Sequence, residues 1–401
     1  MAGSRALGEL SRVVLVLAFG ACSPAESPPQ GVGASAGASN GSSGAHPGDN
    51  GGSASGGGDI ATVGGAGAAS GVAGGPGPAP SAGAGSGGGS GGAAGSSTGG
   101  VAGSSPASTT GIQSDPGTEG DGTVDQPPPY DLQPEALGHV NGAPQGQLLG
   151  PTIYTQKGQY NNWDQWKFTY WVYVPAQYKP GHAAAIHIFQ DGLKYNGDQV
   201  ATPSRFNTPT VFDNLIAEGS MPVTIGVFID PGTNDGHHVG GGDGGRSRQY
   251  DTANDQYGKF LFTEFIPSEI TSKYDIVTDA DGWAMSGHSS GGNASISAAW
   301  FYPDKIHKVL TASATMGLTG GVFPGAFANA PAKPLRIYHM AGSKDDAGVY
   351  LENNQLAQTL KAKGYHYRYR PGQDVHYPPS AAASDFPNAL RWLWRGYKAG
   401  L

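Results

Sequence analysis

The chain has a single cysteine, Cys22, among its 401 residues, so it cannot form an internal disulfide. A folded domain of this protein must therefore be held together by its apolar core. The N-terminal apolar stretch, residues 13–19, is also short, because a membrane-spanning helix needs about 20 apolar residues. Basic residues are few, with 23 Lys and Arg against 31 Asp and Glu. This balance argues against a basic surface for nucleic acid, and we expect no nucleic-acid partner.

The first 22 residues have the layout of an export signal. Arg5 and Arg12 precede the apolar residues 13–19, and the small residues Gly20 and Ala21 lead to Cys22. This order is typical of secretory signals. The run LAFGAC resembles the lipobox of bacterial lipoproteins, which implies that Cys22 is lipidated and becomes the mature N-terminus. We therefore expect an exported protein of the cell envelope, held on a bacterial membrane by a lipid anchor.

Residues 23–129 form a segment of low complexity. Most of them are Gly, Ala, Ser, Pro or Thr, and large apolar residues follow no regular period. Such a segment offers too little apolar surface to offset the entropy lost on ordering. The composition predicts a disordered linker over 23–129 and a folded domain over 130–401.

The part of the chain from residue 130 onward has the pattern of one globular domain. Apolar runs that predict strands alternate with segments of helical period. This alternation is typical of an α/β fold, with a mostly parallel central sheet and helices on both faces. The predicted strands are 167–175 (edge or antiparallel), 183–191, 222–230, 283–286, 308–314, 334–342 and 365–370, and the predicted helices are 208–218, 256–273, 290–302, 350–363 and 384–397.

The pattern Gly-x-Ser-x-Gly occurs several times, but only one copy lies between a predicted strand and a predicted helix. That copy is GHSSG at residues 287–291, centred on Ser289, while four others fall in the glycine-rich linker around Ser35, Ser39, Ser90 and Ser97. A nucleophile elbow needs a strand, a sharp turn that carries the serine, and a helix that starts at once. Ser289 is therefore the predicted nucleophile, and the alternative is a glycine-rich turn without chemistry.

A serine hydroxyl needs a base to take its proton and an acid to hold that base. His376 is the predicted base, because it follows the last predicted strand at the carboxyl edge of the sheet. The acid is expected after strand 334–342, where AGSKDDAG supplies two aspartates. We favour Asp345, with Asp346 and Glu352 as alternatives.

Acyl transfer also needs backbone donors for the developing oxyanion. One is expected from the N–H of Ser290, at the start of the helix after the nucleophile. The second is expected from the loop after FQDG, where a glycine lets the backbone turn its amides inward. Gly192 and Leu193 are the candidates there.

These segments together resemble the esterase family of α/β-hydrolases, which includes enterochelin, feruloyl and acetyl xylan esterases, esterase D and the antigen 85 mycolyltransferases. The resemblance covers residues 148–398. It implies an α/β-hydrolase fold, with Ser289 as nucleophile, His376 as base, Asp345 as acid and the amide of Leu193 as an oxyanion donor. It rests on YWVYVPAQY, FQDGLKYNG, MPVTIGVFIDPG, GRSRQYDTANDQYGKFL, SGHSSGG, GSKDD, GQDVH and ALRWLWRGY.

We therefore expect a serine esterase that forms an acyl-enzyme on Ser289 and uses no metal or organic cofactor. Its expected substrate is a small-molecule, siderophore or polysaccharide-linked ester. Two alternatives stay open: an acyltransferase of the same fold, and a cell-surface binding module without turnover. His237, His238 and Asp243 could ligate a metal, but their spacing matches no specific metal site, and we expect a mobile lid there instead.

Overall fold

The computed structural model describes most of the chain from residue 109 onward. The predicted export signal, Cys22 and residues 23–108 of the predicted linker lie outside the described residues, as do His237, His238 and Asp243. Within the described part, no helix is both long and apolar enough to cross a membrane. The described residues are 109–160, 163–197, 206–234, 245–320, 322–374, 376 and 379–399.

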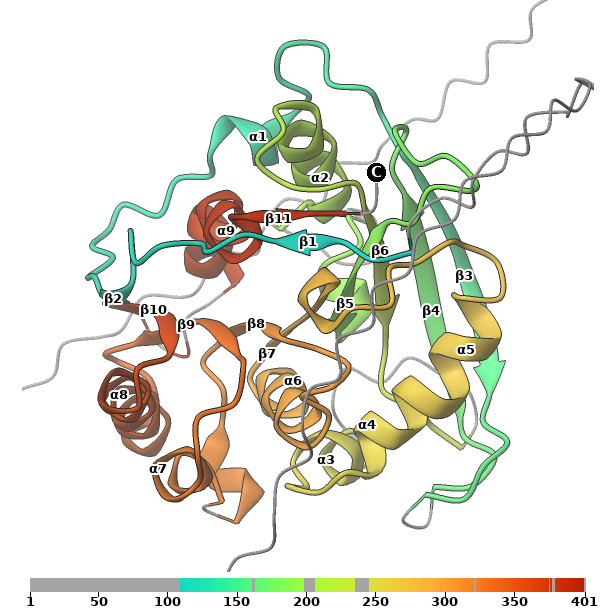
Figure 1. Ribbon diagram of the computed structural model, residues 1–401. Helices are drawn as coiled ribbons and strands as arrows, with labels where there is room; N and C mark the ends of the chain where they lie inside the picture. Colours follow the sequence, from blue (N-terminus) through green and yellow to red (C-terminus); the bar gives the residue numbers. More distant parts are fainter. Residues whose placement is uncertain are drawn as a thin grey trace, which may run out of the picture. The chain divides into compact units, whose positions relative to one another are not determined.

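Among the described residues, nine strands form a central sheet in the order β2-β10-β9-β8-β7-β5-β6-β4-β3 (Figure 1). Neighbouring strands pair in parallel from β2 to β6, whereas β4 is antiparallel to both β6 and β3. The predicted, mostly parallel sheet is confirmed. The strands are β2 (Gly122–Thr123), β3 (Gln147–Thr155), β4 (Lys167–Val174), β5 (Ala185–Gln190), β6 (Thr224–Ile229), β7 (Trp283–His288), β8 (Lys308–Ala312), β9 (Arg336–Gly342) and β10 (His366–Gly372).

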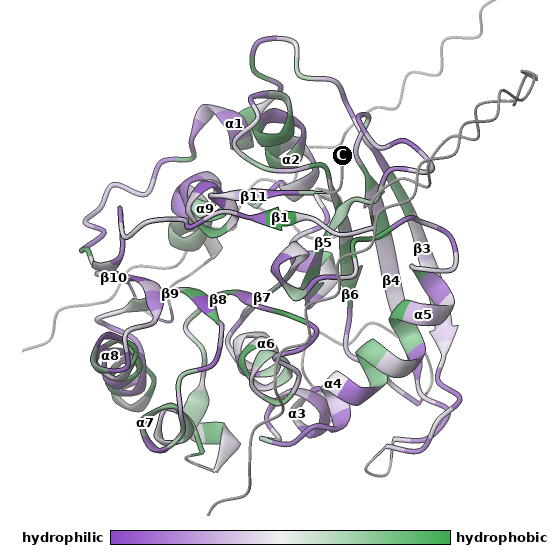
Figure 2. Cartoon of the chain, in the orientation of Figure 1, coloured by the Kyte–Doolittle hydropathy of each residue, from purple (hydrophilic) through white to green (hydrophobic). Residues whose placement is uncertain are grey.

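Helices cover both faces of the sheet, as Figure 1 shows. One face carries α3 (Gly245–Tyr250), α4 (Gln256–Phe260), α5 (Ile266–Glu269), α6 (Ser290–Phe301), α7 (Gly325–Asn329) and α8 (Ala347–Ala362). The other face carries α1 (Pro134–Leu137), α2 (Thr208–Ala217) and α9 (Pro379–Trp394). In Figure 2, α6 is mostly white to green, as expected for a nearly buried helix, while α8 and α9 carry more hydrophilic residues. The predicted fold class is confirmed.

The strand sequences explain why both faces of the sheet are covered. Along β5, Ile186 and Ile188 belong to the core cluster beneath α6, while Phe189 belongs to the cluster beneath α2 and α9. A strand that is apolar on both faces is stable only between two helical layers. Burial of these large side chains supplies the main stabilising free energy, at about 25 cal/mol per Å² of apolar surface.

The described fold starts earlier than residue 130. β1 (Ile112–Gln113) pairs antiparallel with β11 (Tyr397–Lys398), and β2 pairs with β10. Each of these two early strands has only two residues and no apolar alternation. No pattern in the sequence therefore marked them, and they were included in the predicted linker. The boundary predicted at 129/130 is corrected by these pairings.

Buried histidines make the fold sensitive to acid. Burial lowers the pKa of His187 and His339 to about 3 and that of His288 to about 4. An unfolded histidine titrates near pH 6.5, so below that value the unfolded chain binds protons that the folded chain does not. Each buried histidine therefore leaves the free energy of unfolding unchanged above about pH 6.5. Below that pH it lowers this free energy by about 1.4 kcal/mol for each pH unit, until the pH reaches the folded pKa.

Replacing His339 with phenylalanine is expected to weaken this acid sensitivity. The His339 ring stacks on Tyr369 with centroids 4.4 Å apart, and phenylalanine can keep that contact without titrating. Urea unfolding at pH 7 and pH 5 should show the variant losing about 2 kcal/mol less than wild type between the two values. His182→Phe, at an exposed histidine, is the control that should not change the loss. Equal losses in wild type and His339→Phe would contradict this account.

Candidate active site

The turn after β7 has the backbone of a nucleophile elbow. Ser289 is partly exposed and has φ 58° and ψ −127°, a conformation that a non-glycine residue rarely adopts. Glycine is needed before the serine, because a Cβ on Gly287 would lie 2.2 Å from the carbonyl carbon of Gly291. A Cβ on Gly291 would make a tight contact, 3.2 Å from Oδ2 of Asp191, which a small shift of that side chain could relieve. The predicted nucleophile thus sits on a strained turn at the carboxyl end of β7, directly before α6.

The loops after β9 and β10 bring His376 and Asp345 together. Nδ1 of His376 lies 2.9 Å from Oδ1 of Asp345, whose side chain is only 2% exposed. Asp346 instead caps α8 by accepting a hydrogen bond from the amide of Gly348. Glu352 accepts one from the amide of Gly317. Of the three acids considered from the sequence, Asp345 is the one that contacts the imidazole.

His288 joins the base loop to the nucleophile elbow. Its Nε2 lies 3.1 Å from the carbonyl oxygen of His376, and the two imidazole rings have centroids 4.9 Å apart. Burial lowers the pKa of His288 to about 4, so the neutral ring can donate its Nε2–H to that carbonyl. His376 therefore lies beside the residue that immediately precedes Ser289. The side chain of His376 is 43% exposed, so the predicted base is accessible from solvent.

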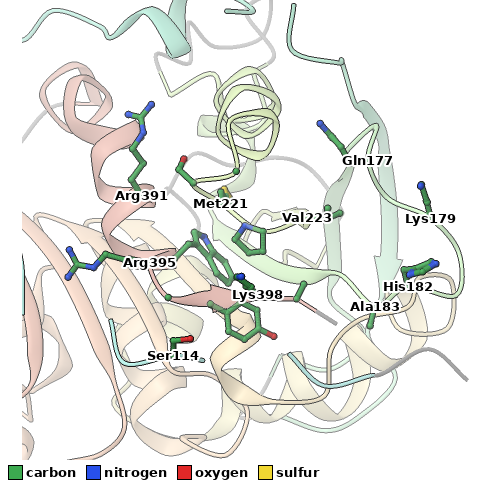
Figure 3. Close-up of a pocket in the computed structure, with 17 residues that line it drawn as sticks. Ser114, Gln177, Lys179, His182, Ala183, Met221, Val223, Arg391, Arg395 and Lys398 are labelled. Carbon is green, nitrogen blue, oxygen red and sulfur yellow. The ribbon is translucent and has the colours of Figure 1, made fainter. Parts of the chain in front are cut away.

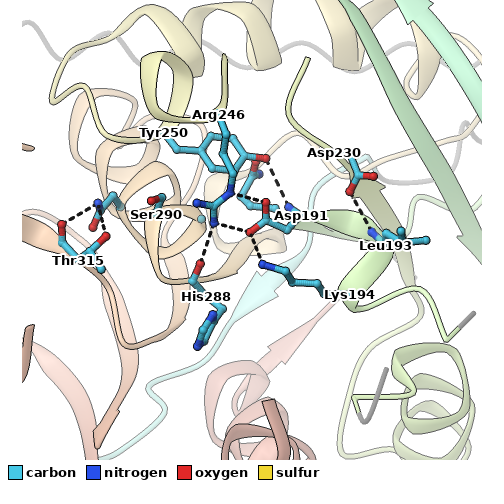
Figure 4. A network of polar contacts seen from close by, with 12 residues as sticks. Asp191, Leu193, Lys194, Asp230, Arg246, Tyr250, His288, Ser290 and Thr315 are labelled. Atoms are coloured by element: carbon cyan, nitrogen blue, oxygen red, sulfur yellow. Dashed lines mark hydrogen bonds and ion pairs between the residues drawn. The ribbon is translucent and has the colours of Figure 1, made fainter. Parts of the chain in front are cut away.

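The predicted oxyanion loop differs from expectation in one respect. Leu193 lies in a 3-10 turn, Gly192–Lys194, that follows β5. Its N–H donates a 3.0 Å hydrogen bond to Oδ1 of Asp230 and is therefore not directed at an open site (Figure 4). Asp230 follows β6, the neighbour of β5 in the sheet, so its carboxylate reaches this turn. The register between two strands, which a single sequence does not reveal, determines this contact.

The other candidates in this region have distinct surroundings. A Cβ on Gly192 would lie 2.4 Å from the carbonyl carbon of Phe228, so the turn needs glycine at that position. The amide of Ser290 belongs to the first turn of α6, where N–H groups have no partner inside the helix. The hydroxyl of Ser290 donates to Oδ2 of Asp251 over 3.0 Å. Its backbone, rather than its side chain, is available to an oxyanion.

Arg246 links the predicted oxyanion loop to the elbow, and no role for it was predicted from the sequence. Its Nε and Nη2 donate to the two carboxylate oxygens of Asp191 over 2.7 and 2.6 Å, and Nη2 also lies 3.4 Å from the carbonyl oxygen of His288 (Figure 4). Lys194 Nζ lies 3.3 Å from the same carboxylate. Burial alone would raise the pKa of Asp191, but the hydrogen bonds from Arg246 and the charge of Lys194 lower it. The sequence signal for Arg246 was the stretch GRSRQYD, which is one of the motifs that resemble the esterase family.

A cavity of about 860 Å³ lies elsewhere on the molecule (Figure 3). Its lining comes from the segments that precede β5 and β6 and from the end of α9, so it belongs to the amino edge of the sheet. The predicted catalytic and oxyanion residues do not line it. In the part of the chain that the structure describes, no group of three or more His, Cys, Asp or Glu side chains could hold a metal ion.

Comparisons with solved structures agree with this fold. A CE1 ferulic acid esterase from the anaerobic fungus Anaeromyces mucronatus has a TM-score of 0.51 at 16% identity, covering 67% of this chain and 98% of its own. The enterobactin esterase of Shigella flexneri has a TM-score of 0.50 at 16% identity, covering 66% of this chain and 62% of its own. At this level of identity the likeness concerns the fold.

Sequence comparisons identify the family. No curated protein matches the chain. The family model described as "Putative esterase" matches residues 162–392, which is more than half of the chain and includes Ser289, Asp345 and His376. The chain therefore belongs to this esterase family, as its motifs indicated.

Proposed function

We propose that the chain is an exported serine esterase that hydrolyses a carboxylic ester through an acyl-enzyme on Ser289. The observation that carries this proposal is the 2.9 Å contact between His376 Nδ1 and the buried carboxylate of Asp345. This pair lies beside His288, the residue that leads into the strained turn of Ser289. A serine on such a turn, with a carboxylate-held imidazole beside the residue before it, supports nucleophilic acyl transfer.

In the proposed reaction, Oγ of Ser289 attacks the ester carbonyl carbon while Nε2 of His376 accepts the hydroxyl proton. Asp345 holds the opposite ring nitrogen and stabilises the imidazolium that forms. The tetrahedral oxyanion receives a hydrogen bond from the amide of Ser290. The amide of Leu193 donates to Oδ1 of Asp230, so it could add a second hydrogen bond to the oxyanion only if that contact were broken.

The second half of the proposed reaction releases both products. The bond between the carbonyl carbon and the alcohol oxygen breaks, and His376 returns its proton to the leaving alcohol. Water then attacks the acyl-enzyme, with His376 accepting its proton, and Ser289 is regenerated as the carboxylic acid leaves. This sequence uses only side chains and backbone amides of the chain and one water.

The substrate that we propose is a small-molecule, siderophore or polysaccharide-linked ester. Two of the fold neighbours are named as a ferulic acid esterase and an enterobactin esterase. These names support testing methyl ferulate and enterobactin beside short p-nitrophenyl esters. Turnover of one class with no detectable turnover of the others would identify the acyl group that the site accepts.

A fluorophosphonate probe tests the nucleophile directly. The probe should label the full-length protein in the envelope fraction of cells that produce it, and Ser289→Ala should stay unlabelled, because the probe phosphonylates an activated serine. Folded wild-type protein that takes no label would argue strongly against the serine esterase. Labelled protein found in the cytoplasmic fraction alone would remove export from the proposal and leave the chemistry.

A further inference from the structure

Ser313 lies behind the carboxylate that holds His376. It directly follows β8 and is fully buried, and its Oγ donates a 2.6 Å hydrogen bond to Oδ2 of Asp345. The other carboxylate oxygen, Oδ1, faces His376 Nδ1 at 2.9 Å and the amide of Asp346 at 2.8 Å. Donors on three sides thus determine the rotation of this carboxylate, and Ser313 supplies the one opposite the imidazole.

The backbone of Ser313 is unusual for a serine. Its φ of 45° lies in the left-handed region, where non-glycine residues are uncommon. Its N–H donates to the carbonyl of Met340 over 2.8 Å, which ties the strained residue to β9. Glycine would adopt this conformation at a lower cost, but glycine carries no hydroxyl. A buried serine in a conformation that suits glycine indicates that the hydroxyl has a role of its own.

The hydroxyl changes what the carboxylate does to the imidazole. A hydrogen bond to an ionised carboxylate stabilises its charge and draws part of it away from the opposite oxygen. Without the Ser313 hydroxyl, Asp345 would stabilise the imidazolium form of His376 more strongly. The carboxylate of Asp345 would also be oriented less firmly. The first effect would leave the imidazole protonated to a higher pH, and the second would lower the rate at every pH.

Other titratable groups do not replace Ser313 in this position. His288, at the end of β7, has its ring 4.9 Å from that of His376 and is neutral near pH 7, because burial lowers its pKa to about 4. The carboxylate of Asp346 caps α8. Asp374 lies on the same loop as His376, and its backbone carbonyl accepts a hydrogen bond from the amide of Lys344. Among the contacts of the Asp345 carboxylate described for this chain, the hydroxyl of Ser313 is the one to Oδ2.

We propose that Ser313 is a positioning residue of the active site. Its hydroxyl orients the Asp345 carboxylate and reduces the negative charge that this carboxylate presents to His376. The inference rests on the proposed roles of Ser289, Asp345 and His376. It goes beyond them because it adds a fourth side chain, on β8, to the set that controls the base.

Two substitutions separate the hydroxyl from the backbone strain. Ser313→Ala removes the donor and keeps the strain, while Ser313→Gly removes the donor and relieves the strain. In full-length protein with p-nitrophenyl acetate, both should lower kcat/KM at pH 8 about tenfold. Both should also move the acid limb of the kcat/KM profile upward by about half a pH unit. Ser313→Gly should melt at a higher temperature than Ser313→Ala.

The controls keep this test decisive. Ser343→Ala removes an exposed serine from the same acid loop and should leave the acid limb where wild type has it. If Ser313→Ala does not fold, Ser313→Gly carries the test alone. Acid limbs that coincide with that of wild type in the folded variants would overturn the role of Ser313. A wild type with no Ser289-dependent turnover would instead overturn the proposed function, and this inference with it.

Discussion

Ser289→Ala is expected to lower kcat/KM for p-nitrophenyl acetate by about five orders of magnitude, with little change in melting temperature. Alanine has no nucleophile, and the oxyanion amides alone retain only a small part of the catalysis. The strained φ of 58° at this position costs alanine about what it costs serine, so the fold should not change. The measurement is steady-state kinetics beside thermal unfolding, with Ser247→Ala, an exposed serine on α3, as the control that keeps full activity.

The same variant distinguishes three possible functions. A hydrolase loses ester cleavage, and an acyltransferase loses both cleavage and product formation with an added sugar or lipid acceptor. A cell-surface binding module keeps its biological activity, because it does not depend on turnover. A Ser289→Ala protein that retained turnover would instead contradict the assignment of the nucleophile.

The grouping of the three candidate catalytic residues could be predicted, because all three lie at the carboxyl edge of a parallel sheet. Ser289, Asp345 and His376 each follow a strand, and β7, β9 and β10 run in the same direction. Residues that follow parallel strands must emerge at one edge, so chain order and strand prediction suffice to group them. The buried strands were recognisable for the same reason, since runs that are apolar on both faces read clearly in a sequence.

The parts that were not predicted depend on tertiary contacts between segments far apart in the chain. The orientation of the Leu193 amide follows from the carboxylate of Asp230, directly after the neighbouring strand β6. The predicted helix 256–273 is divided by a π-helical turn, Leu261–Phe265, which lies between α4 and α5. The edge strand β3 has mostly exposed side chains, so no apolar alternation marks it. Arg246 stood in a recognised motif, but its partner Asp191 is 55 residues away.

Arg246→Met is expected to lower the free energy of unfolding by about 3–5 kcal/mol and to reduce kcat/KM as well. The guanidinium is 13% exposed and the Asp191 carboxylate 8% exposed, so the substitution leaves a buried charge without its bidentate partner. Lys194, at 3.3 Å and itself 40% exposed, compensates only in part. Urea unfolding at pH 7 measures the loss. Arg248→Met, an exposed arginine two residues away on α3, should change stability by less than about 0.5 kcal/mol.

A second substitution separates the stability of this ion pair from its effect on geometry. Asp191→Asn in the Arg246→Met background removes the uncompensated charge, so it should recover part of the lost stability. Activity should not recover with it, because Arg246 connects Asp191, before the predicted oxyanion loop, to the carbonyl of His288, before the proposed nucleophile. Recovery of both together would mean that the ion pair contributes stability alone. Recovery of stability without activity would show that the guanidinium also sets the distance between the two sides of the site.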